Sequence, residues 1–203
     1  NRHVLLSHPL LHQIADDGAA TAFLHPGSEG ETALARHLAN MRSYYDWARE
    51  GQQIPILECA IEVLTATMPT TERSVVNWGD SRPGNIIYRD FEPVGVLDWE
   101  MAGVGPPELD VAWATFFHRF WGFMAGLYGA PPVPEMFRRT DVTATYERVS
   151  GEHLDDLAWY EAAAGLRFGI ILLRMSHRTI AFGMAEPPAE PNGHVMFTPL
   201  LES

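Results

Sequence analysis

The sequence predicts an α+β protein that is mainly helical, with a small β insert at residues 74–98. Apolar residues recur at three- and four-residue steps through several long segments, which is typical of amphipathic helices. The insert instead contains short β-branched runs separated by turn residues. With 203 residues, 46% of them hydrophobic, the chain is long enough for one compact domain and too short for two domains of about 150 residues each.

Five segments carry the helical pattern, and in two of them the sequence also supplies a stop signal. Gly51 ends the first segment, because glycine accepts the left-handed conformation at a helix C-terminus, and Pro69 ends the second. The predicted helices span residues 31–51, 54–68, 108–128, 135–149 and 154–182. We expect irregular structure in residues 1–28 and in the proline-rich tail from Glu186.

The β insert holds three short runs of strand-forming residues, at 74–78, 85–88 and 94–97. Residues 89–93 lie between the last two runs and suit a hairpin connection. Because loops between strands hold polar groups on a rigid frame, we expect the chemistry of the protein to lie in this insert.

Composition excludes several classes of protein. The chain has 26 acidic residues against 14 basic ones, all arginine, and this net charge of −12 argues against nucleic-acid binding. The most apolar stretch, residues 111–130, contains His118 and Arg119, so we expect no membrane contact and a cytoplasmic location. Cys59 has no partner for a disulfide and is expected to be a buried thiol.

Three oxygen-bearing side chains recur at the edges of the predicted strands: Asp80, Asn85 and Asp98. Pro83 and Gly84 lie between the first two, so this loop can be tight and rigid. If the hairpin folds back, Asp98 returns to the mouth of the loop. Carboxylate and amide oxygens are the ligands that magnesium prefers, together with water and substrate phosphates.

Residues 78–85, Trp-Gly-Asp-Ser-Arg-Pro-Gly-Asn, and the later Val-Leu-Asp-Trp-Glu at 96–100 resemble the catalytic segment of the aminoglycoside phosphotransferase family. The family pattern is His-Gly-Asp-x-x-x-x-Asn, followed by an apolar strand that ends in Asp. Residues 105–112 resemble the family's Gly-Asp-Pro-x-x-Asp-Leu-Ala, so the likeness covers about residues 74–113. Leu-Leu-His at 10–12 is similar to the family's Leu-x-x-Leu-His. The family consists of small-molecule kinases with a protein-kinase-like fold.

The resemblance implies a role for each matching residue. Asp80 would be the catalytic base that orients the acceptor hydroxyl, and Arg82 would pair with the transferred phosphoryl group. Asn85 and Asp98 would hold Mg²⁺ beside ATP or GTP, the phosphoryl donor. Asp110 would support the loop by accepting backbone hydrogen bonds. The implied activity is transfer of the γ-phosphoryl group to a hydroxyl of a small molecule.

The resemblance also implies a domain organisation. Residues 29–203 would form a kinase-like C-terminal lobe, with the catalytic segment at 74–113 and a helical substrate-side subdomain at 29–70 and 114–185. In the family the acceptor binds between the catalytic loop and the C-terminal helices. The matching candidates here are Tyr44, Asp46, Trp47, Trp159, Tyr160, Glu161 and Arg167.

Two departures leave alternatives open. Trp78 stands where the family has His, and the chain has neither a Lys nor the Gly-x-Gly-x-x-Gly loop with which kinases bind nucleotide phosphates. We therefore expect the N-terminal nucleotide-binding lobe to be absent from this chain. The alternative is a catalytically silent binding or regulatory module. The acceptor stays open between an aminoglycoside, another amine alcohol and a hydroxyacyl compound, and the oligomeric state stays open too.

Overall fold

The computed structural model describes residues 9, 11–14, 18–24, 32–70, 73–131 and 137–201. It divides the chain into two compact units, each built from two stretches of sequence. The first unit consists of Asn1–Gly27 and Pro69–Glu161, and the second of Ser28–Met68 and Ala162–Ser203. Residues 114–161 thus lie in the same unit as the catalytic segment, whereas the sequence grouped residues 114–185 with 29–70.

The β insert forms two separate two-stranded sheets in the first unit. Strand β1 (Val75–Asn77) pairs antiparallel with β4 (Gly103–Gly105), and Val75 lies opposite Gly105. Strand β2 (Ile86–Arg89) pairs antiparallel with β3 (Glu92–Val96), with a register shift between Ile87 and Tyr88. The sequence did not indicate β4, because a three-residue Gly-Val-Gly run lacks the strand-forming residues that mark the other runs. The insert therefore extends beyond residue 98 to Gly105, and the candidate loop at 78–85 connects its two sheets.

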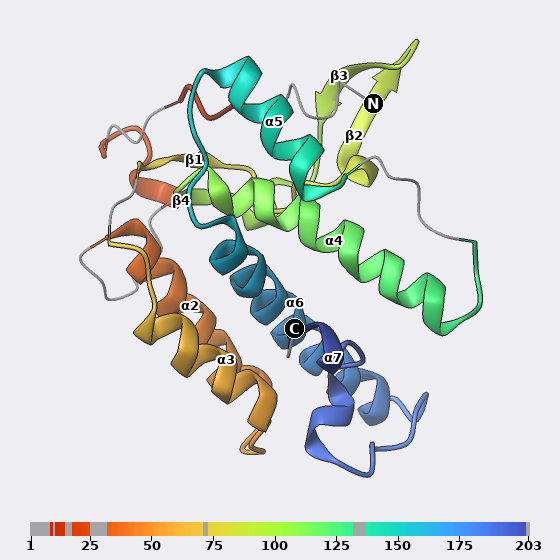
Figure 1. The fold of residues 1–203 in the computed structure, drawn as a ribbon. Coiled ribbons are helices and arrows are strands. Elements are labelled where there is room, and N and C mark those ends of the chain that lie inside the picture. Colours follow the sequence, from red (N-terminus) through yellow and green to blue (C-terminus); the bar gives the residue numbers. More distant parts are fainter. Residues whose placement is uncertain are drawn as a thin grey trace. The chain divides into compact units, whose positions relative to one another are not determined.

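A two-residue turn joins β2 to β3 in the hairpin drawn in yellow-green in Figure 1. Asp90 and Phe91 both have positive φ angles, 51° and 66°. Two consecutive positive φ angles are typical of the type I′ turn, whose twist matches that of the flanking strands. The hairpin expected at residues 89–93 is present.

The first unit also contains α4 (Glu108–Leu127), α5 (Arg139–Ser150) and the beginning of α6 (Leu157–Ala181). Trp113, Phe116, Phe117 and Phe120 of α4 are buried, whereas Trp121 on the same helix is 53% exposed. Gly151 ends α5 with a φ angle of 75°. The structure begins α5 at Arg139; positions 135 and 136 of the predicted helix lie outside the described residues.

The second unit consists of α2 (Ala33–Ala48), α3 (Pro55–Ala66), the rest of α6 and α7 (Thr198–Leu201). The Thr32 side chain caps α2 by accepting a hydrogen bond from the Ala35 amide at 3.1 Å. A Cβ atom at Gly169 would lie 2.7 Å from a methyl group of Leu57, so α6 approaches α3 closely there.

The tail from Glu186 is more ordered than the sequence predicted. A 3-10 helix at Pro191–His194 precedes α7, and both pack near α3. Phe197 is fully buried and stacks on Phe168 with ring centroids 5.5 Å apart. The prolines suggested an irregular tail, but one of them begins the 3-10 helix and the aromatic residue anchors the segment.

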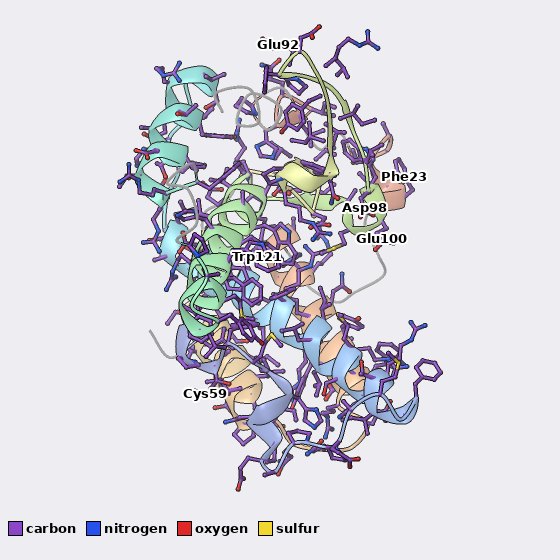
Figure 2. All side chains as sticks on the ribbon, turned by 90° about the vertical axis from the view of Figure 1, so that its right-hand side faces the viewer. Phe23, Cys59, Glu92, Asp98, Glu100 and Trp121 are labelled. Carbon is purple, nitrogen blue, oxygen red and sulfur yellow. The ribbon has the colours of Figure 1, made fainter. Side chains whose placement is uncertain are left out.

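Cys59 is exposed on α3, which corrects the expectation of a buried thiol (Figure 2). The buried positions of α3 are Leu57, Ile61 and Leu64, at helical spacing. A residue two positions after Leu57 points to the opposite side of a helix. None of the described helices is long and apolar enough to span a membrane.

Two buried carboxylates of the first unit, those of Glu161 and Glu108, have opposite pKa shifts. Glu161 accepts hydrogen bonds from Arg119 (3.1 Å) and from the Arg139 Nε (2.8 Å). Burial alone would raise the pKa of Glu161, but hydrogen bonds from Arg139 and Thr115 and the two guanidinium charges lower it. Glu108 accepts a 3.3 Å bond from the Asp155 amide, and burial raises its pKa.

The opposite pKa shifts of Glu161 and Glu108 predict opposite pH dependences of stability for variants at the two positions. A lowered pKa adds stability above the usual glutamate value of 4.5, and this is lost as the pH falls through the folded-state pKa. Glu161→Gln should therefore cost about 2 kcal/mol at pH 7, less than a fully buried pair because both arginines reach solvent, and much less near pH 3. A raised pKa stabilises the fold fully below 4.5, and this contribution is lost as the pH rises through the folded-state pKa. Relative to wild type, Glu108→Gln should therefore be more stable at pH 7 than at pH 4.

Urea denaturation of both variants at several pH values measures these differences. The pKa directions would be contradicted if the loss of unfolding free energy in Glu161→Gln stayed constant from pH 3 to pH 7. They would also be contradicted if Glu108→Gln became more stable relative to wild type as the pH falls.

Candidate active site

The loop at residues 78–85 leaves β1 and enters β2, and its first turn requires glycine. Gly79 has a φ angle of 88°, and a Cβ atom there would lie 2.0 Å from the carbonyl oxygen of Met101. No side chain fits at that distance, so Gly79 allows the loop to pass directly beside the 3-10 helix Trp99–Met101. The loop and the segment after β3 are therefore in contact.

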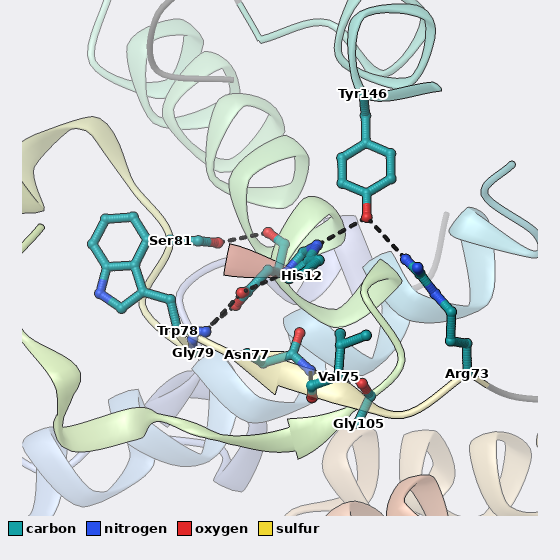
Figure 3. A network of polar contacts seen from close by, with 10 residues as sticks. His12, Arg73, Val75, Asn77, Trp78, Gly79, Ser81, Gly105 and Tyr146 are labelled. Atoms are coloured by element: carbon teal, nitrogen blue, oxygen red, sulfur yellow. Dashed lines mark hydrogen bonds and ion pairs between the residues drawn. The ribbon is translucent and has the colours of Figure 1, made fainter. Parts of the chain in front are cut away.

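Asp110, in the first turn of α4, holds the beginning of the loop through Trp78, Gly79 and Ser81, which Figure 3 labels. Its Oδ2 accepts the backbone N–H of Trp78 and its Oδ1 that of Gly79, both at 2.7 Å. The backbone carbonyl of Asp110 also accepts the Ser81 hydroxyl at 2.6 Å. Asp110, which we expected to support the loop, is completely buried and fixes three consecutive parts of it.

A chain of hydrogen bonds supports the Asp110 carboxylate from the other side (Figure 3). His12 lies 3.1 Å from Oδ2 of Asp110 through Nε2 and 2.9 Å from the Tyr146 hydroxyl through Nδ1. Burial raises the pKa of Tyr146 to about 12, so the hydroxyl is a donor at neutral pH. Arg73 donates to the Tyr146 oxygen at 3.4 Å. The sequence indicated His12 only weakly and did not indicate Tyr146.

Four donors surround the carboxylate of Asp80, which is 5% exposed. Its Oδ2 accepts hydrogen bonds from Arg82 Nε (3.0 Å) and Asn85 Nδ2 (2.7 Å), and Arg82 Nη2 completes an ion pair with it at 2.9 Å. Its Oδ1 accepts from the Trp113 indole at 2.8 Å. The sequence did not indicate Trp113 as a partner of Asp80. The available signal was its position three residues after Asp110, on the same face of α4.

Backbone contacts tie the end of β3 to the same loop. The Leu97 amide donates to the Asn85 carbonyl, and the Trp78 indole donates to the Leu97 carbonyl, both at 2.8 Å. The next residue, Asp98, has φ 64° and ψ 62°, a left-handed conformation that is strained for a residue other than glycine. Its side chain is exposed (Figure 2). Trp78, which replaces the family's His, is thus a donor that holds the residue before Asp98.

Asn85 and Asp98 fit the ligand chemistry of magnesium. Both Asn85 amide hydrogen bonds use Nδ2, and Oδ1 has no hydrogen-bond partner among the described residues. The Asp98 carboxylate is solvent-accessible. The described residues contain no group of three His, Cys, Asp or Glu that would hold a metal unaided. Magnesium usually takes one or two carboxylates and completes its shell with water and phosphate oxygens, so this donor set is suitable.

The acceptor candidates at the start of α6 are largely engaged within the first unit. Tyr160 is buried and lies against the Trp159 ring, with centroids 5.0 Å apart. The Trp159 indole N–H is buried and has no partner among the described residues. The Glu161 carboxylate is bound by Arg119 and Arg139.

The remaining acceptor candidates lie in the second unit. Tyr44 and Trp47 stack with ring centroids 5.3 Å apart on the exposed face of α2. Asp46 pairs with Arg42 and Arg49. Arg167 is half-buried on α6.

Comparison with known proteins identifies the family. The model described as the phosphotransferase enzyme family matches residues 10–151. The chain belongs to this family. The match covers the loop at 78–85 together with Asp98, Asp110, His12 and Tyr146, and so includes the hydrogen-bonded core described above.

Solved phosphotransferases have the same fold. A Ralstonia eutropha JMP134 protein, provisionally named an aminoglycoside phosphotransferase, aligns with 98% of this chain at a TM-score of 0.69 and 19% identity. The macrolide 2′-phosphotransferase from Brachybacterium faecium aligns with 97% at a TM-score of 0.56 and 20% identity. The chain spans 61% and 58% of these two proteins.

A sequence relative is larger still. Mouse acyl-CoA dehydrogenase family member 10 is 33% identical over 129 residues, which are 63% of this chain and 11% of that protein. The chain therefore corresponds to one part of each of these proteins.

The Asp110 contacts predict a large cost for an isosteric change. Asp110→Asn replaces one acceptor oxygen by an NH₂ group that faces buried donors, so we expect a loss of about 3 kcal/mol in the free energy of unfolding. Asp141→Asn is the matched control, because the Asp141 side chain is 52% exposed and forms a surface ion pair with Arg138, and it should cost less than about 0.5 kcal/mol. Urea denaturation measures both. Equal costs for the two variants would show that Asp110 is not an anchor.

Proposed function

We propose that this chain carries the catalytic loop of a magnesium-dependent phosphotransferase that moves the γ-phosphoryl group of ATP or GTP to a hydroxyl of a small molecule. The observation that supports this most is the setting of Asp80. Its carboxylate is buried and oriented by Arg82, Asn85 and Trp113, while Asn85 and the residue before Asp98 are joined by a backbone hydrogen bond. Family membership supports the same chemistry.

Asp80 would act as the base. The acceptor hydroxyl donates its hydrogen bond to a carboxylate oxygen, its oxygen forms a bond to the γ-phosphorus, and the bond from phosphorus to the β–γ bridging oxygen breaks. The nucleoside diphosphate leaves, and the hydroxyl proton passes to Asp80. In phosphoryl transfer the protein contributes mainly alignment and charge stabilisation, which the rigid setting of Asp80 would provide.

Arg82 has a second role in this proposal. Its guanidinium now pairs with Asp80 and is 43% exposed. It would turn toward the transferred phosphoryl oxygens, because a planar guanidinium matches their geometry. This movement would also open Oδ2 of Asp80 to the acceptor.

Asn85 and Asp98 would hold the metal. Bound Mg²⁺ supplies charge neutralisation for the β- and γ-phosphate oxygens. The contribution of the chain is to fix the two ligands: Asn85 through its side-chain bonds to Asp80, and Asp98 through Trp78, which fixes the preceding carbonyl. The left-handed backbone at Asp98 is a strained conformation of the kind that functional sites retain.

One observation favours the alternative, a catalytically silent binding module. The Arg82–Asp80 ion pair occupies the oxygen that the acceptor would need. In that case the loop would serve only as a rigid platform. The experiment below separates the two functions.

The proposal predicts different effects for the two aspartates in the full-length protein. Asp80→Asn should lower kcat by about 10³-fold while the dissociation constant of Mg–nucleotide stays within about twofold, because the base acts on the acceptor. Asp98→Asn should weaken nucleotide binding in Mg²⁺ but not in EDTA. Transfer from γ-labelled ATP and GTP is measured over aminoglycosides, choline-type alcohols and hydroxyacyl compounds, and nucleotide binding by calorimetry.

Asp141→Asn serves as the surface control and should retain activity. Unchanged turnover in Asp80→Asn would remove this residue from the mechanism. A wild-type protein that binds no Mg–nucleotide and transfers nothing over the panel would establish the silent module instead.

A further inference from the structure

The second unit contains a cavity of about 650 Å³ that the catalytic proposal does not use. It lies between the C-terminal turn of α2 and the last turns of α6, with Tyr44 and Trp47 on one helix and Arg174 and Arg178 on the other. Its volume is within the range of sites that bind small molecules. We propose that this cavity binds a planar aromatic anion, a ring that carries a phosphate or a carboxylate.

The wall on the α2 side supplies aromatic surface. The Tyr44 and Trp47 rings are nearly parallel, with an angle of 16° between their planes. Trp47 is 55% exposed, and Met175 and Phe182 across the cavity are 56% and 67% exposed. These exposed side chains would pack against a ligand ring, with Trp47 contributing the edge of its ring because the Arg174 guanidinium lies over its face.

The wall on the α6 side supplies positive charge. Arg174 lies 4.3 Å from the Trp47 ring centroid and pairs with Glu50 at 2.5 Å. Arg178 lies 5.6 Å from the Phe182 centroid, and its guanidinium has no ion pair or hydrogen bond with a described residue. Arg178 therefore keeps its full set of donors for an anion, and a phosphate or carboxylate accepts two parallel bonds from such a group.

The charge balance distinguishes an anion from a cation. Two arginines and one glutamate line the cavity, so its net charge is positive although the chain as a whole carries −12. The position over Trp47 where a ligand cation would bind is already taken by the Arg174 guanidinium. His177 adds no negative charge, because an imidazole is either neutral or cationic, and its Nδ1 lies 3.0 Å from the Ala48 carbonyl. A cationic ligand would meet repulsion from both arginines.

Binding to the full-length protein tests the proposal with naphthalene probes that differ only in charge. Calorimetry with 1-naphthyl phosphate and 1-naphthoate should give dissociation constants on the order of 0.5 mM, as expected for ligands of this size. 1-Naphthalenemethanol and 1-naphthylmethylammonium should bind at least about tenfold more weakly, because they lack the charge-assisted bonds. Equal or tighter binding of the cation would overturn the proposal.

Paired variants locate the binding. Arg178→Gln and Trp47→Leu should each weaken 1-naphthyl phosphate about tenfold. The matched controls are Arg42→Gln, on α2 but outside the cavity lining, and Trp121→Leu, a tryptophan that is 53% exposed; neither should change the affinity. Asp80→Asn should bind the probe like wild type, which separates this result from the catalytic proposal. Probe binding unaffected by Trp47→Leu and Arg178→Gln, or self-association of the protein that Trp47→Leu abolishes, would show that the cavity has another use.

Discussion

The carboxylate of Asp110 is the interaction on which the candidate site depends. It is completely buried and accepts hydrogen bonds from two consecutive backbone amides and from His12. A buried carboxylate is unfavourable unless donors compensate for lost water, so these contacts stabilise one arrangement of the loop and penalise others. Asp110 lies in the first turn of α4, and most of the aromatic side chains of this helix are packed in the core. The loop is therefore hydrogen-bonded to a rigid element.

The two proposed functional carboxylates depend on this anchor through two tryptophans. Trp113 follows Asp110 on α4 and donates to Asp80, so the base and its anchor share one helix. The backbone N–H of Trp78 donates to the Asp110 carboxylate, and its indole N–H donates to the carbonyl of Leu97, the residue before Asp98. Trp78 therefore joins the loop to the segment that carries the proposed metal ligand, and its buried indole ring packs there as well.

The sequence predicted the elements well where local signals are strong. Helical spacing located all the long helices, and the run from Gly79 to Asn85 identified the loop. It did not indicate β4 or the contact of Trp113 with Asp80, because both depend on partners distant in the chain. It did not indicate Tyr146 either, whose hydroxyl meets His12 across 134 positions of sequence. Local patterns encode periodicity and turns, whereas side-chain pairs between separate elements are set by tertiary packing.

The most direct measurement is amide hydrogen exchange at Trp78 and Gly79 in the full-length protein. If both N–H groups are held by a buried carboxylate, they exchange only when the first unit unfolds, as slowly as the core amides of α4. The exposed loop residue Gly84 should exchange far faster. Exchange of Trp78 and Gly79 at the rate of Gly84 would show that the loop opens freely in the native state and that Asp110 does not hold it.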